Sequence, residues 1–120
     1  MISKVILRKN NRERRKVRIR KKVFGTTDMP RLTVFRSNRY IYGQIIDDTK
    51  GRTLVSTAAE VKKLHAEGKK LEAAKKCGET LAQKAVKSKI TKVVFDRNGY
   101  IYTGRVASFA DGARQGGLKF

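Results

Sequence analysis

The stretch RLTVFRSNRYIYGQIIDDTKGRTLVST, residues 31–57, decides the fold of this 120-residue chain. Its apolar and polar residues alternate, which is the pattern of strands that have one buried face. Three strands are predicted, over residues 31–35, 40–47 and 53–57. The polar runs RSNR and DTKG between them are typical of turns, so the three strands should form an antiparallel meander.

The alternation also assigns the side chains to two faces of the predicted sheet. In the first strand Leu32 and Val34 lie on one face, and Thr33 and Phe35 lie on the other. The second strand carries two such sets, which are Tyr40, Tyr42, Gln44 and Ile46 on one side and Ile41, Gly43, Ile45 and Asp47 on the other.

Beyond the meander, the spacing of the apolar residues becomes helical. Residues 58–70 are polar and ambiguous, but a long apolar stripe then predicts a helix that begins near Leu71. Residues 93–95, Val-Val-Phe, predict a short buried strand, and a second stripe predicts a helix that ends before Gly116. The two stripes consist of Leu71, Ala74, Gly78, Leu81, Ala85 and Ile90, and of Val106, Phe109, Ala110 and Ala113.

The order of strands, helix, strand and helix predicts an α+β fold. In this fold the three-stranded antiparallel meander is extended by a strand–helix unit into a mixed sheet, and two helices pack on that sheet. A basic amino-terminal arm, residues 1–24, precedes a single globular domain, residues 25–120.

The arm differs in character from the rest of the chain. It holds eleven basic residues and one acidic residue, Glu13, whereas the other 96 residues hold 19 basic and nine acidic ones. Because it has too few apolar residues to build a core, the arm should be disordered, or helical only weakly, until it binds a partner. The arm residues predicted to bind RNA are Arg8, Lys9, Arg12, Arg14, Arg15, Lys16, Arg18, Arg20, Lys21 and Lys22.

The net charge of +20 indicates the class of partner. Repulsion among so many positive charges opposes the compact state until a polyanion neutralises them. Nucleic acid is the usual polyanion, because Lys and Arg that bind its phosphates release the counterions condensed on it. The sequence has no apolar stretch long enough for a membrane span and no secretory signal, so we expect a soluble, intracellular protein. One cysteine and one histidine allow neither a disulfide nor a zinc site.

All four tyrosines lie in two copies of one frame, Val-Phe-x-x-Asn-x-Tyr-Ile-Tyr, which begins at Val34 and again at Val94. Unpaired RNA bases stack on aromatic and guanidinium planes, while Asn and Ser hydrogen-bond base edges or the 2′-hydroxyl. The two frames, with the arginines beside them, therefore predict RNA contacts. Alternate tyrosines also suit the apolar face of a sheet, so a structural role is the competing interpretation for each tyrosine.

No set of residues predicts an enzyme. His65 lies in a Lys-rich stretch and is expected at the surface, and Cys77 is expected to be a small buried hydrophobe. Asp47 and Asp48 are expected to shape a turn. A DNA-binding architectural protein would also be small and basic, but the sequence has no helix-turn-helix or zinc signature.

Three segments together resemble a known family. They are RLTVFRSNRYIYGQIIDD at residues 31–48, FDRNGYIYTGRV at residues 95–106 and ADGARQGGL at residues 110–118. With the basic arm before them, they occur in the order and at the spacing of the bacterial family of large-subunit ribosomal protein eighteen. The resemblance covers nearly the whole chain.

This resemblance implies a structural protein of the large ribosomal subunit, located in the cytoplasm, that binds 5S rRNA. It implies that the protein helps to attach 5S rRNA to the large-subunit (23S) rRNA in the central protuberance, beside other 5S-binding ribosomal proteins. It implies no catalysis, no cofactor, no membrane and no small-molecule substrate. Besides the arm, the RNA contacts are expected at Arg36, Ser37, Asn38, Arg39, Tyr40, Tyr42, Arg97, Tyr100, Tyr102 and Arg105.

The chain departs from the family pattern at two positions. Thr103 stands where many members have His before Gly-Arg-Val, and Asn98 precedes Gly99 in place of Gly or Ser. Asn98-Gly99 by itself predicts a hairpin turn. The family topology instead leads from a strand through a loop into a helix, and we adopt that topology.

Overall fold

The computed structural model describes residues 4–66 and 69–120. None of the helices in these two ranges has the length and apolar content needed to cross a membrane. In chain order the elements are α1 (Lys4–Arg20), β1 (Arg31–Arg36), β2 (Ile41–Asp47), β3 (Arg52–Ser56), the 3-10 helix η1 (Ala58–Glu60), α2 (Val61–Leu64), α3 (Lys70–Lys87), β4 (Val94–Asp96) and α4 (Arg105–Gln115).

The four strands form one mixed sheet in the order β3-β2-β1-β4. The neighbours β3, β2 and β1 are antiparallel, whereas β4 pairs with β1 in parallel, with Arg31 opposite Val94 and Thr33 opposite Asp96. Helix α3 lies between the meander and β4 in the chain, as parallel pairing of β1 and β4 requires a crossover connection. The predicted α+β fold, a meander extended by a strand–helix unit, is confirmed.

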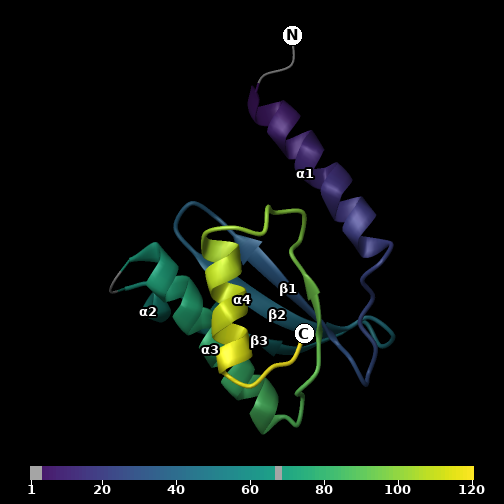
Figure 1. Cartoon of the computed structure of the whole chain (residues 1–120), viewed down its shortest axis with the longest axis vertical. Coiled ribbons are helices and arrows are strands. Elements are labelled where there is room, and N and C mark those ends of the chain that lie inside the picture. Colours follow the sequence, from purple (N-terminus) through teal and green to yellow (C-terminus); the bar gives the residue numbers. More distant parts are fainter. Residues whose placement is uncertain (1–3, 67–68) are drawn as a thin grey trace.

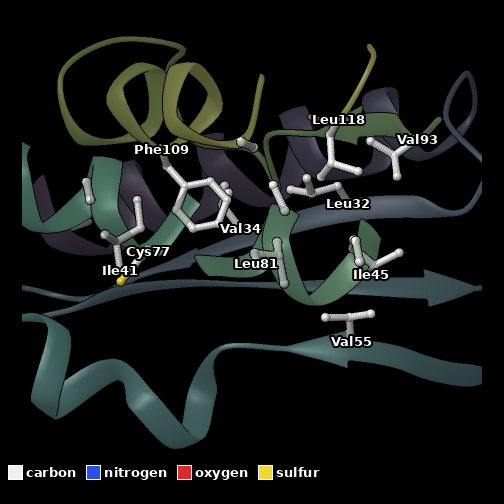
Figure 2. Close-up of a cluster of buried hydrophobic side chains, with 14 of the residues drawn as sticks. Leu32, Val34, Ile41, Ile45, Val55, Cys77, Leu81, Val93, Phe109 and Leu118 are labelled. Carbon is white, nitrogen blue, oxygen red and sulfur yellow. The ribbon is translucent and has the colours of Figure 1, made fainter. Parts of the chain in front are cut away.

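Helices α3 and α4 cover one face of the sheet, and Figure 1 shows both helices in front of the strands. Leu32 and Val34 are fully buried on this face, and Phe109 reaches down from α4 toward them (Figure 2). Burying each such large side chain contributes roughly 1.5–3 kcal/mol. The face predicted from the alternation of β1 is therefore the core face.

The two helices touch backbone to backbone where each carries a glycine. A Cβ atom on Gly78 would lie 2.1 Å from the carbonyl oxygen of Phe109, and one on Gly112 would lie 2.1 Å from that of Lys75. Side chains at these positions would push α3 and α4 apart. The close approach is what lets Phe109 reach the sheet.

The structure differs from the sequence prediction at both ends of α3. Leu71 is 53% exposed, although it began the predicted apolar stripe, and Ile90 lies three residues beyond the end of the helix. The buried stripe instead includes Ala73 and Cys77. Residues that follow a helix can still pack on the core, as the partly buried Ile90 does.

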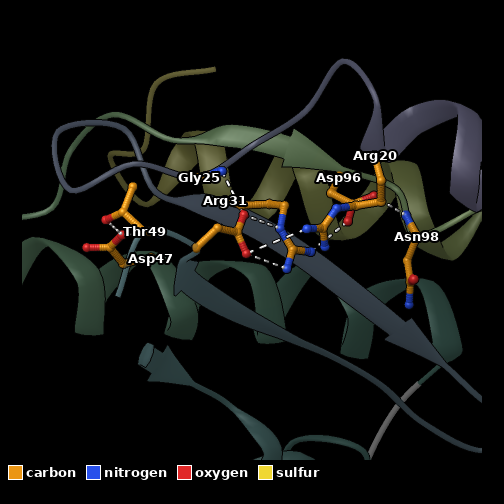
Figure 3. A network of polar contacts seen from close by, with 8 residues as sticks. Arg20, Gly25, Arg31, Asp47, Thr49, Asp96 and Asn98 are labelled. Atoms are coloured by element: carbon orange, nitrogen blue, oxygen red, sulfur yellow. Dashed lines mark hydrogen bonds and ion pairs between the residues drawn. The ribbon is translucent and has the colours of Figure 1, made fainter. Parts of the chain in front are cut away.

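A buried ion cluster ties the strands together on the sheet face opposite α3 and α4 (Figure 3). The Arg31 guanidinium donates to Asp48 Oδ2 and Oδ1 at 3.0 and 3.1 Å and to Asp96 Oδ2 at 2.8 Å. The side chains of Arg31 and Asp96 are only 8% and 2% exposed. One guanidinium therefore joins β1 to the end of β2 and to β4.

The protonation of this cluster follows from its hydrogen bonds. Burial lowers the pKa of Arg31, but the hydrogen bonds that Arg31 donates to Asp48 and Asp96, together with the negative charges of these residues, outweigh burial and leave that pKa above its usual value. The hydrogen bond from Arg31 is the main cause of the lowered pKa of Asp48. The guanidinium and the Asp48 carboxylate therefore both stay charged at neutral pH.

The adjacent Asp47 and Asp48 do different work. Asp47 accepts hydrogen bonds from the backbone and hydroxyl of Thr49 at 3.0 and 2.5 Å, so it shapes the β2–β3 turn as predicted. Asp48 does not belong to that turn network: besides pairing with Arg31, it accepts the Gly25 amide at 2.7 Å. Asp48 lies in the turn as predicted, but its carboxylate bonds to residues 17 and 23 positions away in sequence.

Replacing Arg31 by Met should lower the free energy of unfolding by about 3–5 kcal/mol, because it leaves the buried Asp96 without a cation and Asp48 with only the more distant Arg20. The pH dependence should also reverse. In the native chain the lowered pKa of Asp48 gives stability that is present above about pH 4 and lost in acid, so stability should change little between about pH 7 and pH 5.

In the Met variant the pKa of Asp48 should rise above its unfolded value, so the variant should become more stable as the pH falls from about 7 to about 5. Urea unfolding at both pH values measures this. Arg31→Lys, which keeps the charge but loses the forked geometry, is the control and should lose less stability. A Met variant with the native pH profile would contradict the assignment.

Candidate RNA-binding surface

Helix α1 presents two different basic faces. Arg12, Arg15, Lys16 and Ile19 are partly buried at the spacing of one helix face, whereas Arg14 and Arg18 are exposed on the other. After the helix, the side chains of Lys21 and Lys22 are exposed as well. Arg8 and Lys9 lie within α1, but their side chains are outside the described part of the structure.

The partly buried face of α1 docks on the loop that follows β4. Arg12 Nε donates to the carbonyl oxygen of Asn98 at 3.3 Å, and Arg15 Nε donates to that of Gly99 at 2.8 Å. A Cβ atom on Gly99 would lie 2.6 Å from the Arg12 carbonyl oxygen, and the Gly99 φ is +77°. Only glycine fits this close contact and this backbone conformation.

Tyr100 is the centre of the docking site. Its hydroxyl donates to the Arg36 carbonyl oxygen at 3.1 Å and accepts the Arg36 amide at 3.2 Å. The guanidinium carbons of Arg12 and Arg36 lie 4.1 and 4.9 Å from the centre of its ring, in cation–π contact. Tyr100 as a whole is 9% exposed, and its ring stacks on arginines of its own chain.

A cleft of about 390 Å³ opens between α1 and this loop. Arg12, Arg15 and Arg36 line it together with Tyr100 and the exposed Ile101, and none of its lining residues is acidic. Three guanidinium groups without a carboxylate form a surface suited to an anion such as a phosphate.

Arg105, the first residue of α4, adds to the positive charge of this region. Burial lowers its pKa, and the positive charge of Arg36 lowers it further. Its Nη1 atom is buried and has no hydrogen-bond partner among the described residues. Arg97 is engaged instead, because its Nη1 donates to the Tyr100 carbonyl oxygen at 2.6 Å.

The turn between β1 and β2 forms a second predicted contact region. The Ser37 amide donates to the Tyr40 carbonyl oxygen at 2.8 Å, which closes the turn and leaves Asn38 and Arg39 exposed at its tip. On the uncovered sheet face Tyr42 stacks on Phe35, with ring centres 5.1 Å apart. Phe35 was predicted to lie on this face but was not predicted as a contact.

His65 has partners that the sequence did not reveal. Its Nε2 accepts the Ile41 amide at 3.2 Å, its Nδ1 lies 2.8 Å from the Val61 carbonyl oxygen, and its ring meets Tyr40 edge-on. The expectation of a surface histidine is met only in part, because His65 is half-buried. Burial raises the pKa of the Cys77 thiol to about 11, and this residue is a buried hydrophobe as predicted.

The two tyrosine frames adopt opposite arrangements although their sequences match. In the first, Ile41 is fully buried and both tyrosines are partly exposed. In the second, Ile101 is 60% exposed, Tyr100 is buried and Tyr102 is 43% exposed. Within the second copy, Asn98 and Gly99 form a left-handed turn, and the Tyr-Ile-Tyr triplet that follows them leads toward α4, so its alternation is not that of a strand.

No group of three or more side chains suited to hold a metal ion occurs in residues 4–66 and 69–120.

Comparison with known proteins gives a match over residues 6–120 to the family described as "Ribosomal L18 of archaea, bacteria, mitoch. and chloroplast". The large ribosomal subunit protein uL18 of Clostridium kluyveri is 53% identical over 113 residues, which cover 94% of this chain and 95% of the relative. The same protein is 52% identical in Clostridium tetani and 49% identical in Clostridium botulinum strain Loch Maree, with the same coverage.

The chain belongs to the ribosomal protein L18 family.

Membership of the L18 family confirms the coarser functional predictions. The chain is a structural, RNA-binding protein of the large ribosomal subunit, it acts in translation and it is not an enzyme. Its partners are rRNA and ribosomal proteins, and the similarity to the bacterial L18 proteins places it in the ribosome of the cytoplasm. Which RNA it binds, and with which residues, remain predictions.

Replacing Gly99 by Ala should detach α1 from the domain, because the new methyl group meets the Arg12 backbone. Trypsin should then cleave faster after the basic residues at 12–22. Gly104→Ala is a matched control: Gly104 also has a positive φ, +57°, but a Cβ atom there meets nothing within 4 Å. If both variants were cleaved in the arm at the native rate, the docked helix would be refuted.

Proposed function

We propose that the chain binds 5S rRNA and helps to attach it to the large-subunit rRNA, forming the central protuberance with neighbouring 5S-binding proteins. The observation that carries the proposal is the acid-free arginine cleft around Tyr100, beside the exposed basic face of α1. The choice of 5S rRNA rests on the resemblance of the tyrosine frames and the final helix to the bacterial family. The family membership supports the large-subunit setting.

Different residues of the surface have different proposed roles. Arg14, Arg18, Lys21 and Lys22 are exposed and supply phosphate contacts, which give affinity without sequence preference. Arg12 and Arg15 position the helix, since their Nε groups bind the carbonyl oxygens of the 98–99 loop. The free face of the docked helix is thereby held in a fixed direction relative to the sheet.

Recognition of unpaired bases falls to the aromatic and polar groups. Tyr42, stacked on Phe35, and the exposed Tyr102 offer ring surface at two ends of the site. Asn38 and Arg39 project from the β1–β2 turn, where they can reach base edges. Arg36, which lines the cleft, holds a phosphate between these two regions, and the nearby charge of Arg105 adds to the attraction.

The most direct test of the proposal is competition between nucleic acids for the intact protein. At about 0.15 M salt we expect 5S rRNA to bind at least about tenfold more tightly than an unrelated structured RNA of equal length or duplex DNA. Equal affinity for the two RNAs would refute 5S recognition. Equal affinity for RNA and DNA would mean that the surface binds any nucleic acid through its positive charge alone.

The exposed face of α1 should account for part of the salt dependence of binding. Arg14→Gln with Arg18→Gln should reduce the slope of log affinity against log salt by about 1.4–1.8, as expected for the loss of two phosphate contacts. Lys62→Gln with Lys63→Gln is the control, because it removes the same charge from the exposed surface of α2. If the slope fell equally in both double variants, α1 would have no special role.

A further inference from the structure

A groove of about 610 Å³ lies along the outer edge of β4, and none of the residues that line it is proposed to bind RNA. Its apolar part includes Val23 and Met29, from the segment between α1 and β1, and Phe95 of β4. Met29 is 41% exposed, so the apolar part is open to solvent. An apolar patch rimmed by polar residues is one of the features of protein interaction sites.

The aromatic rings of the groove are already engaged with each other. Phe95 stacks on Phe120 with ring centres 5.3 Å apart. Tyr102, which does not line the groove and is proposed to bind RNA, meets Phe95 edge-on at 5.8 Å. The Arg114 guanidinium lies 4.4 Å from the centre of the Phe120 ring. A nucleobase binds best where an aromatic ring face is open for stacking. The open surface of the groove is instead aliphatic and thioether. The apolar part therefore suits a protein side chain better than a base.

The rim of the groove is cationic. Lys92, Arg114 and Lys119 are all exposed, and no acidic residue lines the groove. An apolar side chain that entered the groove would bring its neighbours in sequence within reach of these three cations. Charge complementarity therefore favours a partner in which Asp or Glu flanks the apolar residue.

The carboxy-terminal residues occupy only part of the outer edge of the sheet. β4 is the last strand of the sheet, and beyond it the described chain contributes only the parallel bridge between Lys92 and Lys119. There the Val93 amide donates to the Lys119 carbonyl oxygen at 3.1 Å. An exposed strand edge is a common place for a partner chain to align.

We infer that this groove is a docking surface for another protein of the large subunit. The partner inserts one apolar side chain between Met29 and Phe95 and places a flanking Asp or Glu against Lys92, Arg114 and Lys119. This inference goes beyond the proposed function, because it concerns a protein partner and holds whichever rRNA the chain binds.

Photo-crosslinking in purified large subunits tests the inference. A chain that carries p-benzoylphenylalanine in place of Met29 should form a crosslink that survives ribonuclease, and the peptide attached should contain an apolar residue flanked by Asp or Glu. The same crosslinker in place of Leu71, 53% exposed on α3, is the control and should not capture that peptide. A crosslink to RNA, to a peptide without an acid, or no crosslink at all would overturn the inference.

Charge reversal distinguishes a specific role of the cationic rim from a general effect of net charge. Lys92→Glu with Lys119→Glu should lower the yield of the Met29-site crosslink by about tenfold, because the partner's acid then meets like charge. Lys62→Glu with Lys63→Glu makes the same change in net charge on α2 and should leave the yield unchanged. Equal yields in the two double variants would contradict the cationic rim. Binding of 5S rRNA, measured separately, reports on the proposed function alone.

Discussion

The buried Arg31 guanidinium is the interaction on which the rest of the structure depends. It joins β1 to Asp48 at the end of β2 and to Asp96 at the end of β4 (Figure 3). Two carboxylates could not be buried so close together without a cation between them. Arg20, the last residue of α1, reaches the same cluster, with its guanidinium 3.7 Å from Asp48. The cluster therefore fixes the parallel strand and the end of the basic helix relative to the meander.

The position of β4 decides where the RNA surface can form. Asp96 accepts the Asn98 amide at 2.8 Å, and the Asn98 side chain donates to the Val34 carbonyl oxygen at 3.0 Å. These bonds hold the next loop against β1, so that Tyr100 reaches the Arg36 backbone. The loop then offers its carbonyl oxygens to α1. A chain of polar contacts thus leads from the buried cluster to the direction in which α1 points.

The sequence predicted the parts of the fold that depend on local periodicity. The strands, the two long helices and the buried face of β1 follow from alternation and helical spacing. It could not predict the Arg31 cluster, whose partners lie 17 and 65 residues away, or the docking of α1 on the 98–100 loop. The two tyrosine frames show most clearly what local sequence patterns cannot predict. The same nine-residue frame buries Ile41 in a strand and exposes Ile101 in a loop, because tertiary contacts decide which side chain faces inward.

Docking on the 98–100 loop means that the domain holds α1 in place before any RNA binds. A separate 17-residue helix with so many like charges is marginal in water. Amide hydrogen exchange in the free, full-length protein tests the claim against a synthetic peptide of residues 4–20. Docking predicts that amides of residues 12–20 exchange at least about tenfold more slowly in the protein than in the peptide. Equal exchange rates would contradict docking and would mean that α1 becomes helical only when it binds RNA.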